Sequence, residues 1–325
     1  MAKAIRMHEI GGPDVFRWED VDVAAPGPGE VLLQQVAVGL NFIDVYHRTG
    51  LYPLETLPAI PGLEGAGQVI AIGDGVRHLQ IGDAVAYASP PMGAYAEQRV
   101  MPADRLVRLP EFIDEQQAAA MMLQGMTAQY LLRRTYHVEA GDTILFHAAA
   151  GGVGLIACQW AKALGATVIG TVGSEEKAEL ARAHGCDHVI LYRNDDIAGQ
   201  VRELTAGEGV EVVYDSVGKE TFAASLNSLR PMGMLVSFGN ASGPVLPFDP
   251  GILAQKGSLF FTRPSLMTYT AKHQDLLASA QDLFGMVQSG AVRIEINQTY
   301  PLREAAQAHR DLEARKTTGS TVLIP

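Results

Sequence analysis

The chain has little cysteine and little positive charge. Cys158 and Cys186 are its two cysteines, too few for a disulfide-stapled secreted protein or for a four-cysteine zinc site. Lysine and arginine number 25 against 36 aspartates and glutamates, so the net charge is −11. Nucleic-acid binders usually present a basic face, so neither nucleic acid nor an anionic membrane is expected as a partner. We predict a protein of a reducing compartment, the cytoplasm.

Long hydrophobic runs are also scarce. The N-terminus has no apolar segment typical of a signal peptide. Residues 143–161 lack Asp, Glu, Lys and Arg, but Gly151, Gly152 and Gly154 interrupt them. This pattern predicts a buried strand, a glycine turn and a buried helix, and no membrane span.

The 325 residues are enough for about two domains. The first 110 read as β-rich, with strands expected at 31–38, 67–72 and 81–88. A helical stretch is expected from Glu115 to Arg134, capped by Asp114 and interrupted at Gly125, where two helices would meet at a bend.

From Asp142 onward, strands and helices alternate. Apolar strands are predicted at 143–146, 167–172, 188–191, 210–214, 234–238 and 258–262, and helices at 155–164, 175–183, 197–204 and 221–229. Continuous apolar strands are typical of a parallel sheet covered on both faces. The pattern predicts an α/β fold with a doubly wound, parallel-sheet Rossmann domain that binds a dinucleotide.

The C-terminal part is expected to rejoin the N-terminal domain, with helices at 271–289 and 302–315 and strands at 294–297 and 321–324. We therefore predict a discontinuous catalytic domain, residues 1–125 and 265–325, and a dinucleotide-binding domain, residues 126–264.

A glycine-rich segment follows the first parallel strand and opens its helix. In His147–Gly154, Ala149, Gly151 and Gly154 stand at the three glycine positions of the G-x-G-x-x-G fingerprint. The middle glycine lets the backbone approach a pyrophosphate, and the helix N-terminus supplies N–H groups for it. An ordinary tight turn without a ligand is the alternative.

The end of the second parallel strand bears on the choice between NADPH and NADH. NAD enzymes usually carry an acidic residue there, whereas this chain has Gly173 and Ser174, with Lys177 one turn later. Ser174 and Lys177, with Tyr192 and Arg193 after the third strand, suit a 2′-phosphate, so we predict NADPH. Glu175 or Glu176 would favour NADH if either faced the ribose. The loops after the fifth and sixth strands extend the expected cofactor path: Ser237–Asn240, which includes Phe238, and Thr262–Ser265, which includes Arg263.

Five segments of the sequence resemble a known family. The most specific segments are Asn41–Tyr46, Arg48–Pro53, His147–Trp160, Tyr214–Gly218 and Val236–Asn240. The whole chain is similar to zinc-independent medium-chain dehydrogenases/reductases, specifically the bacterial NADPH:quinone oxidoreductases related to zeta-crystallin. The resemblance implies a GroES-like β-rich catalytic domain beside the Rossmann domain.

The resemblance implies an enzyme without zinc. Zinc-dependent relatives carry a ligand histidine before the glutamate of a G-H-E motif, where this chain has Gly62-Leu63-Glu64. The cysteine ligand of the early loop is also missing, because that region reads Asn41–Asp44. No metal site is expected.

The resemblance also implies site residues. Asn41, Tyr46 and Tyr52 correspond to the quinone pocket and are our predicted catalytic residues, although each is also explained by helix capping or packing. Gln124 stands where some relatives carry a lysine, so no proton-donating role is assigned to it. The implied cofactor contacts are Phe42, Asp44, Tyr46, Tyr130, Gly152, Val153, Gly173, Ser174, Lys177, Tyr192, Val217, Gly239, Asn240, Ser242, Pro264, Ser265 and Arg315, to which the motifs add Gly151, Phe238 and Arg263.

We therefore predict hydride transfer from NADPH to a quinone. One alternative is an NADPH-dependent reductase of the C=C bond of an enal or enone. The other is an NADPH-binding protein without enzymatic activity, RNA-binding or crystallin-like, against which the net charge of −11 argues. The resemblance further implies a homodimer, for which residues 257–261 would be an edge segment.

Overall fold

The structure is a computed structural model that describes residues 1–193 and 196–325. It divides into two compact units. Unit 1 contains residues 1–124, 270–281 and 294–325, and unit 2 contains residues 125–269 and 282–293. The predicted division placed all of 265–325 with the N-terminal domain, whereas residues 265–269 and 282–293 belong to unit 2. Packing explains the second segment: a Cβ at Gly125 would lie 2.5 Å from Leu283, and Gln129 donates a hydrogen bond to Asp282.

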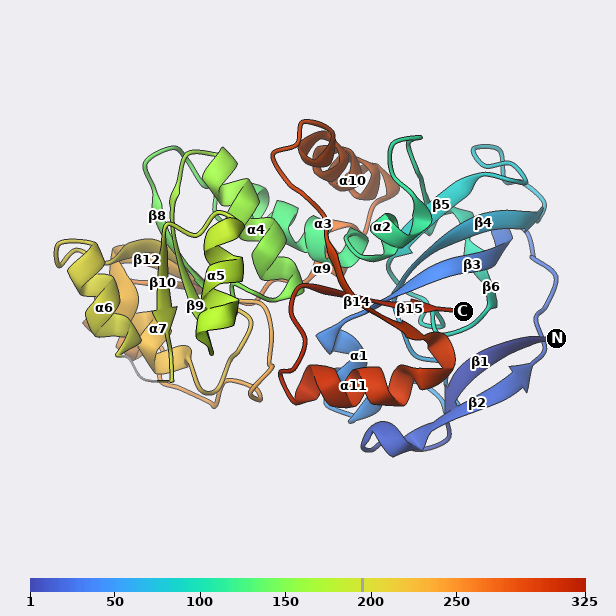
Figure 1. Cartoon of the computed structure of the whole chain (residues 1–325), viewed down its shortest axis with the longest axis horizontal. Helices are drawn as coiled ribbons and strands as arrows, with labels where there is room; N and C mark the ends of the chain where they lie inside the picture. The colour runs from blue at the N-terminus through green and yellow to red at the C-terminus, as the bar shows by residue number, and fades with distance from the viewer. Residues whose placement is uncertain (194–195) are drawn as a thin grey trace. The chain divides into compact units, whose positions relative to one another are not determined.

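Unit 2 is built on a parallel sheet (Figure 1). Within the described residues, its six strands follow the order β10-β9-β8-β11-β12-β13, the order of a doubly wound nucleotide-binding sheet. The predicted Rossmann domain is confirmed. The strands are β8 (Thr143–His147), β9 (Thr167–Val172), β10 (His188–Leu191), β11 (Val210–Asp215), β12 (Leu229–Ser237) and β13 (Phe260–Thr262).

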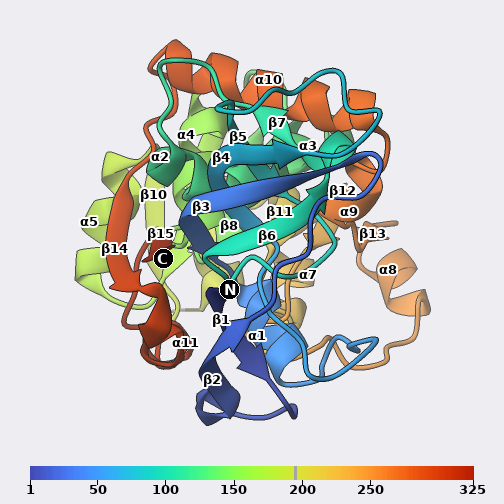
Figure 2. The same cartoon turned by 90° about the vertical axis from the view of Figure 1, so that its right-hand side faces the viewer.

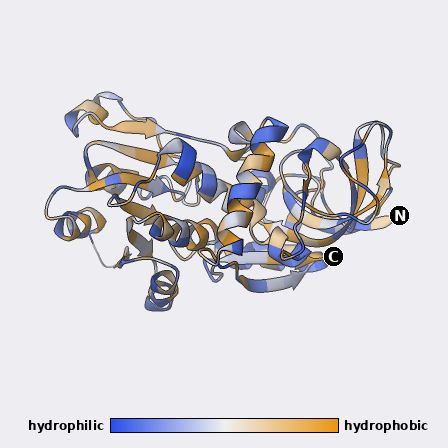
Figure 3. Cartoon of the chain, turned by 90° about the horizontal axis from the view of Figure 1, so that it is seen from above, coloured by the Kyte–Doolittle hydropathy of each residue, from blue (hydrophilic) through white to orange (hydrophobic). Residues whose placement is uncertain are grey.

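Helices cover this sheet, whose strands are rich in hydrophobic residues (orange in Figure 3). Leu145, Ile169 and Val213 pack with Ile197, Val201 and Leu226 of α6 and α7, while α4 and α5 contact β8, β9 and β10. The helices of the unit are α3 (Met122–Tyr130, which begins in unit 1), the π-helix Leu131–Thr135, α4 (Gly152–Ala163), α5 (Glu175–Ala183), α6 (Ile197–Leu204), α7 (Phe222–Ser228), α8 (Gly251–Gln255) and α9 (Leu266–Tyr269).

Unit 1 is β-rich, as predicted (Figure 2). Its main sheet has the order β14-β15-β3-β4-β5-β7, with β6 on β3, and β1 pairs with β2 separately. The strands are β1 (Ala2–Met7), β2 (Phe16–Val21), β3 (Glu30–Leu40), β4 (Glu64–Ile72), β5 (Ala84–Ala88), β6 (Gln98–Pro102), β7 (Val107–Arg108), β14 (Ile296–Pro301) and β15 (Ser320–Ile324).

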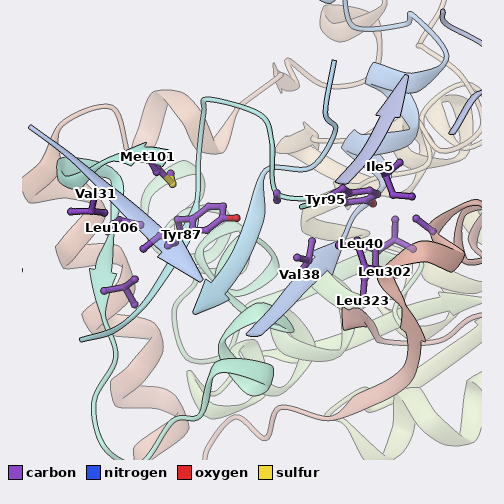
Figure 4. Packing of buried hydrophobic residues seen from close by; sticks show 14 of the residues in the cluster. Ile5, Val31, Val38, Leu40, Tyr87, Tyr95, Met101, Leu106, Leu302 and Leu323 are labelled. Atoms are coloured by element: carbon purple, nitrogen blue, oxygen red, sulfur yellow. The ribbon is translucent and has the colours of Figure 1, made fainter. Parts of the chain in front are cut away.

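One core joins the two ends of the chain in unit 1. Ile5 and Tyr95 pack near Leu302 and Leu323 (Figure 4). The helices are α1 (Phe42–Arg48), α2 (Glu115–Ala119), α10 (His273–Gln288, which continues into unit 2), α11 (Ala305–Glu313) and the 3₁₀ turns Pro13–Val15, Ala103–Arg105 and Leu302–Glu304.

The helical stretch expected from Glu115 to Arg134 is interrupted, but not where predicted. The break falls at Ala120 and Met121, between α2 and α3, so the prediction of a bend at Gly125 was wrong. Gly125 lies inside α3, where the absence of a side chain makes room for Leu283. Asp114 caps α2 as predicted, accepting a hydrogen bond from the Gln117 N–H. In the described part of the chain, no helix is both long and apolar enough to cross a membrane.

Candidate functional site

The glycine-rich segment forms the turn between β8 and α4. Gly151 is the N-cap of α4, so the helix presents its free N–H groups and its positive dipole end at Gly152 and Val153. A Cβ at Gly154 would lie 2.5 Å from the Ala148 carbonyl and 2.6 Å from that of Ala149. This crowding explains why glycine occupies the third position of the fingerprint. Ala148 itself has a φ of 55°, a strained value for alanine. This geometry suits a phosphate group.

The end of β9 offers a second polar turn. Ser174 caps α5 by accepting a hydrogen bond from the Lys177 N–H. A Cβ at Gly173 would lie 2.6 Å from the Tyr192 hydroxyl, so Tyr192 lies directly against this turn. Glu175 forms an exposed ion pair with Arg182, seven residues further along α5, at 2.9 Å. That neither Glu175 nor Glu176 faces the ribose stays a prediction.

The loops after β11 and β12 are tied together. Ser242 donates its N–H and its hydroxyl to the Val217 carbonyl, at 2.8 and 2.9 Å. A Cβ at Gly239 would lie 2.4 Å from the Ser216 carbonyl, so only glycine allows this approach. Arg263, after β13, donates to the Ser237 carbonyl at 3.1 Å. The structure thus brings together predicted cofactor residues that follow three neighbouring strands: Val217, Phe238, Gly239, Asn240, Ser242, Arg263, Pro264 and Ser265.

An aromatic stack lies on α3 in the same unit. The rings of Tyr130 and Tyr269 are parallel to within 13°, with centroids 4.6 Å apart. Arg134 lies over Tyr269, with its guanidinium carbon 5.0 Å from the ring centroid. Tyr130 precedes the π-helix Leu131–Thr135, and π-turns are frequent at functional sites.

In unit 1, the three predicted catalytic residues stand at α1 and in the loop that follows it, and two of them, Tyr46 and Tyr52, are in contact. Asn41 is the N-cap of α1, and Tyr46 lies on that helix. The chain then folds back, so that the Tyr52 N–H donates to the Tyr46 carbonyl and the two rings meet edge to face, 5.2 Å apart. Phe42 packs beside Tyr46, with ring centroids 6.2 Å apart. Arg315, also in unit 1, is exposed just after α11 and has a φ of 59°.

Asn41 belongs to a buried polar cluster with Glu64. Its Nδ2 donates to Glu64 Oε2 at 2.6 Å, and its Oδ1 accepts from Gln124 at 3.3 Å. The Ser320 hydroxyl lies 2.7 Å from the Gln124 amide and 2.7 Å from the Ala120 carbonyl. Burial raises the pKa of Glu64 to about 8, despite hydrogen bonds from Asn41 and the Leu123 N–H. A pKa raised in this way favours the protonated carboxyl at neutral pH.

Asp44 is fully buried and points inward. It accepts hydrogen bonds from the Asn41 N–H at 2.9 Å and from the Tyr95 hydroxyl at 3.1 Å. Tyr95 also contacts His309, whose other ring nitrogen lies 3.2 Å from Arg48. Burial raises the pKa of Asp44 to about 7. The Asp44 side chain thus caps α1 and holds the Asn41 backbone in place. Its predicted contact with the cofactor remains a prediction.

The described residues give no metal cluster. No group of three or more His, Cys, Asp or Glu in this part of the chain could hold a metal ion. Leu63, at the position of the zinc-ligand histidine in the relatives, is a buried apolar residue. One pair, His184 and His188, has the H-x-x-x-H spacing, but His184 caps the end of α5 and His188 begins β10, so the two do not share a helix face.

Sequence reasoning missed two buried sets. The first is the Asp44, Tyr95 and His309 contact, whose members are far apart in sequence and carry no local motif. The second joins His147, Thr171, Ser225 and Asp215 in unit 2. Two of these residues stand in segments on which the family resemblance depends, His147–Trp160 and Tyr214–Gly218, which was the available signal.

The sheet order and the loops at the carboxyl ends of its strands define a dinucleotide-binding protein of the Rossmann class. Residues 27–111 match the alcohol dehydrogenase GroES-like domain, and residues 152–278 match the family described as zinc-binding dehydrogenase. A quinone oxidoreductase of Pseudomonas aeruginosa is 56% identical over 325 residues, covering 100% of both chains. A 2-haloacrylate reductase of a Burkholderia species is 47% identical and covers 100% of this chain and 99% of its own.

Among solved structures, Escherichia coli quinone oxidoreductase complexed with NADPH has a TM-score of 0.98, with 47% identity and 100% coverage of both chains. The chain belongs to the medium-chain dehydrogenase/reductase family, in its zeta-crystallin-like quinone oxidoreductase branch.

Proposed function

We propose that this protein is an NADPH:quinone oxidoreductase that works without zinc. The observation that carries the proposal is the full-length similarity to quinone oxidoreductases at 47–56% identity, one of them in complex with NADPH. The site supports the cofactor choice, because the β9 turn carries Ser174 and Lys177 and the Glu175 carboxylate is engaged by Arg182.

In unit 2, we assign the dinucleotide to the loops at the carboxyl ends of the strands. The α4 N-terminus at Gly151–Val153 would bind the pyrophosphate, since its N–H groups and helix dipole favour negative charge. Ser174, Lys177 and Tyr192 would bind the 2′-phosphate. When bound, NADPH supplies the hydride.

In unit 1, Asn41, Tyr46 and Tyr52 are proposed to bind the quinone. Reduction to the hydroquinone consumes one hydride and one proton, and negative charge develops on a quinone oxygen. Neutral hydrogen-bond donors aimed at that oxygen stabilise the charge. Asn41 suits this role because Glu64 takes one of its two amide hydrogens, which leaves a second. Glu64 holds Asn41 and stores a proton in the interior.

The test begins with calorimetric titration of the purified protein with NADPH and with NADH. 1,4-Benzoquinone is then added, and the loss of the reduced-nicotinamide absorbance is measured. We expect tight NADPH binding, weak NADH binding and quinone-dependent oxidation. Tighter NADH binding would contradict the roles of Ser174 and Lys177. NADPH binding without quinone-dependent oxidation would contradict the activity alone.

A second candidate is reduction of an activated C=C bond, favoured by the 47% identity to a 2-haloacrylate reductase. Hydride addition to a conjugated C=C bond places charge on a carbonyl oxygen, which the same donors would stabilise. Rates with 2-chloroacrylate and a 2-alkenal, measured beside the quinone, decide between the two activities. A higher kcat/KM for either alkene would replace the quinone as the proposed substrate.

We also propose a cytoplasmic homodimer. β13 pairs with β12 and ends the strand order of its sheet, and Phe260 on it is 57% exposed. An exposed edge strand with an apolar side chain is a template for pairing with a second copy. Analytical ultracentrifugation of wild type and Phe260→Lys tests this, with a shift toward monomer expected for the variant.

A further inference from the structure

A line of buried polar side chains crosses unit 2 at the carboxyl ends of β9, β8 and β11. Thr171 Oγ1 lies 3.0 Å from His147 Nδ1, and His147 Nε2 lies 3.0 Å from Ser225 Oγ. Ser225 then donates to Asp215 Oδ2 at 2.7 Å. None of the four residues is more than 1% exposed. Buried polar groups of this kind are costly unless each is hydrogen-bonded, and here each one is.

The hydrogen bonds of this line run in one direction. Ser225 has a single hydroxyl hydrogen, and Asp215 receives it. His147 Nε2 must therefore be the donor to Ser225, and its Nδ1 must accept from Thr171. Burial lowers the pKa of His147, which favours this neutral form. Each group in the line thus depends on the orientation of its neighbour.

Asp215 at one end of the line shapes the loop after β11. Its Oδ1 accepts the N–H groups of Val217 and Gly218, at 2.8 and 3.0 Å, and the Thr221 hydroxyl contacts both of its oxygens. The carbonyl of Val217 in turn binds Ser242, in the loop after β12. One carboxylate therefore fixes the turn after β11, to which the loop after β12 is hydrogen-bonded through Ser242.

The other end of the line lies where β8 and β9 lead into the two turns assigned to phosphate groups. His147 immediately precedes Ala148, the strained residue of the glycine-rich turn. The Ala149 N–H donates to the Thr171 carbonyl at 3.1 Å, and Thr171 stands two residues before Gly173. The four side chains thus connect the ends of three adjacent strands, and each strand leads into a loop assigned to the dinucleotide.

We propose that Thr171, His147, Ser225 and Asp215 are positioning residues that couple these loops, so that the dinucleotide meets one preorganised surface. The inference rests on the proposed NADPH site. It adds that the affinity of that site depends on side chains that do not touch the ligand. Preorganised loops bind more tightly because less ordering is required on binding.

Helix α7 supplies a matched pair of substitutions. Ser225 and Ser228 are both fully buried serines, but Ser228 donates to the Ala224 carbonyl within its own helix. Ser225→Ala leaves the His147 donor unpaired, and we expect the Kd for NADPH and for NADH to rise by about tenfold. Ser228→Ala should leave both values unchanged. The KM for benzoquinone at saturating NADPH should stay the same in both variants.

A double-mutant cycle distinguishes coupling from simple destabilisation. Thr171 and Ser225 are bridged by His147, so Thr171→Val and Ser225→Ala should weaken NADPH binding together by no more than about the larger single effect. Combined with Ser228→Ala, the Thr171→Val effect should be unchanged. If Ser225→Ala does not fold, Ser225→Cys keeps a weaker donor and should give a smaller, still non-additive effect.

The outcomes separate the two proposals. Wild type that fails to bind NADPH overturns the proposed function and, with it, this inference. If the wild type binds NADPH but the effects of Thr171→Val and Ser225→Ala on the NADPH Kd multiply in the double variant, the inference alone is overturned. An unchanged NADPH Kd in Ser225→Ala, with a melting temperature lowered as in Ser228→Ala, also overturns it, because the line would then serve stability only.

Discussion

Tyr46 and Tyr52 share one edge-to-face contact, and Asn41 caps the helix that carries Tyr46. Their polar groups differ in surroundings. The Asn41 amide is held by Glu64 and Gln124, whereas Tyr52 lies half-buried in the loop that follows α1. Among the three, Tyr52 is therefore the residue whose polar group can be removed with the least disturbance of the buried cluster around Asn41 and Glu64.

We expect Tyr52→Phe to lower kcat with benzoquinone by about tenfold, because a donor to the developing oxyanion is lost. The Kd for NADPH should not change. Stopped-flow kinetics and calorimetry measure the two quantities. Tyr300→Phe is the control, since Tyr300 donates to Asp311 on the surface of the same unit. Equal kcat in wild type and Tyr52→Phe would remove Tyr52 from the proposed mechanism.

Sequence could predict the site residues only where a local pattern marks them. Gly151 and Ser174 follow strands and cap helices, so their roles follow from spacing along the chain. The buried contacts around Asp44 do not follow from spacing, because Tyr95 is 51 residues from Asp44 and His309 is 214 residues from Tyr95. A buried contact across such distances depends on tertiary packing, about which a single sequence says nothing.

At the scale of elements, the predicted ranges match best in unit 2. The predictions for β9, α5, β10 and α6 agree with the structure at both ends. Apolar runs bounded by caps and glycines define these elements locally. The strands β1 and β2 were missed because their alternation is broken by charged residues, and they are held by pairing with each other. The α2–α3 break was misplaced because a packing glycine was interpreted as a bend.

Gly154 tests the turn between β8 and α4. In Gly154→Ala, the new Cβ would lie 2.5 Å from the Ala148 carbonyl and 2.6 Å from that of Ala149. Both are backbone atoms, so the loop itself must shift. We expect unit 2 to lose about 1–3 kcal/mol of stability and NADPH affinity to fall by more than about tenfold. Urea denaturation and calorimetry measure the two effects.

Gly285 supplies the control for that substitution. It lies within α10, where a Cβ meets no atom within 4 Å. Gly285→Ala should therefore stabilise the protein by up to about 1 kcal/mol through helix propensity alone, and leave NADPH affinity unchanged. A Gly154→Ala variant that behaves like Gly285→Ala would show that the glycine-rich turn has room that the structure does not indicate.

At the scale of the whole molecule, buried ionisable groups set opposing pH dependences. Burial lowers the pKa of His147 in unit 2, and burial together with Arg48 lowers that of His309 in unit 1 to about 3. A depressed histidine contributes stability that is present above about pH 6.5 and is lost as the pH falls below it. The two buried acids of unit 1 act in the other direction, because their folded-state pKa values are raised.

The stability that Asp44 and Glu64 contribute is fully present below their unfolded pKa values. It is lost as the pH rises toward about 7 for Asp44 and about 8 for Glu64. From about pH 6.5 to about pH 8, where the histidine contributions are already complete, the free energy of unfolding of unit 1 should therefore fall by about 2 kcal/mol. In Glu64→Gln, most of this decline should disappear, whatever constant cost the substitution adds.

Trp18 in β2 and Trp160 in α4 are the two tryptophans of the chain, one in each unit. In a Trp160→Phe background, Trp18 fluorescence during urea denaturation therefore reports unit 1, where Glu64 lies. The exposed Glu111, changed to Gln, is the control and should keep the wild-type decline. If Glu64→Gln and wild type lost equal stability over this pH range, Glu64 would not hold its proton at neutral pH. Asn41 would then donate its hydrogen bond to a carboxylate and not to a protonated carboxyl.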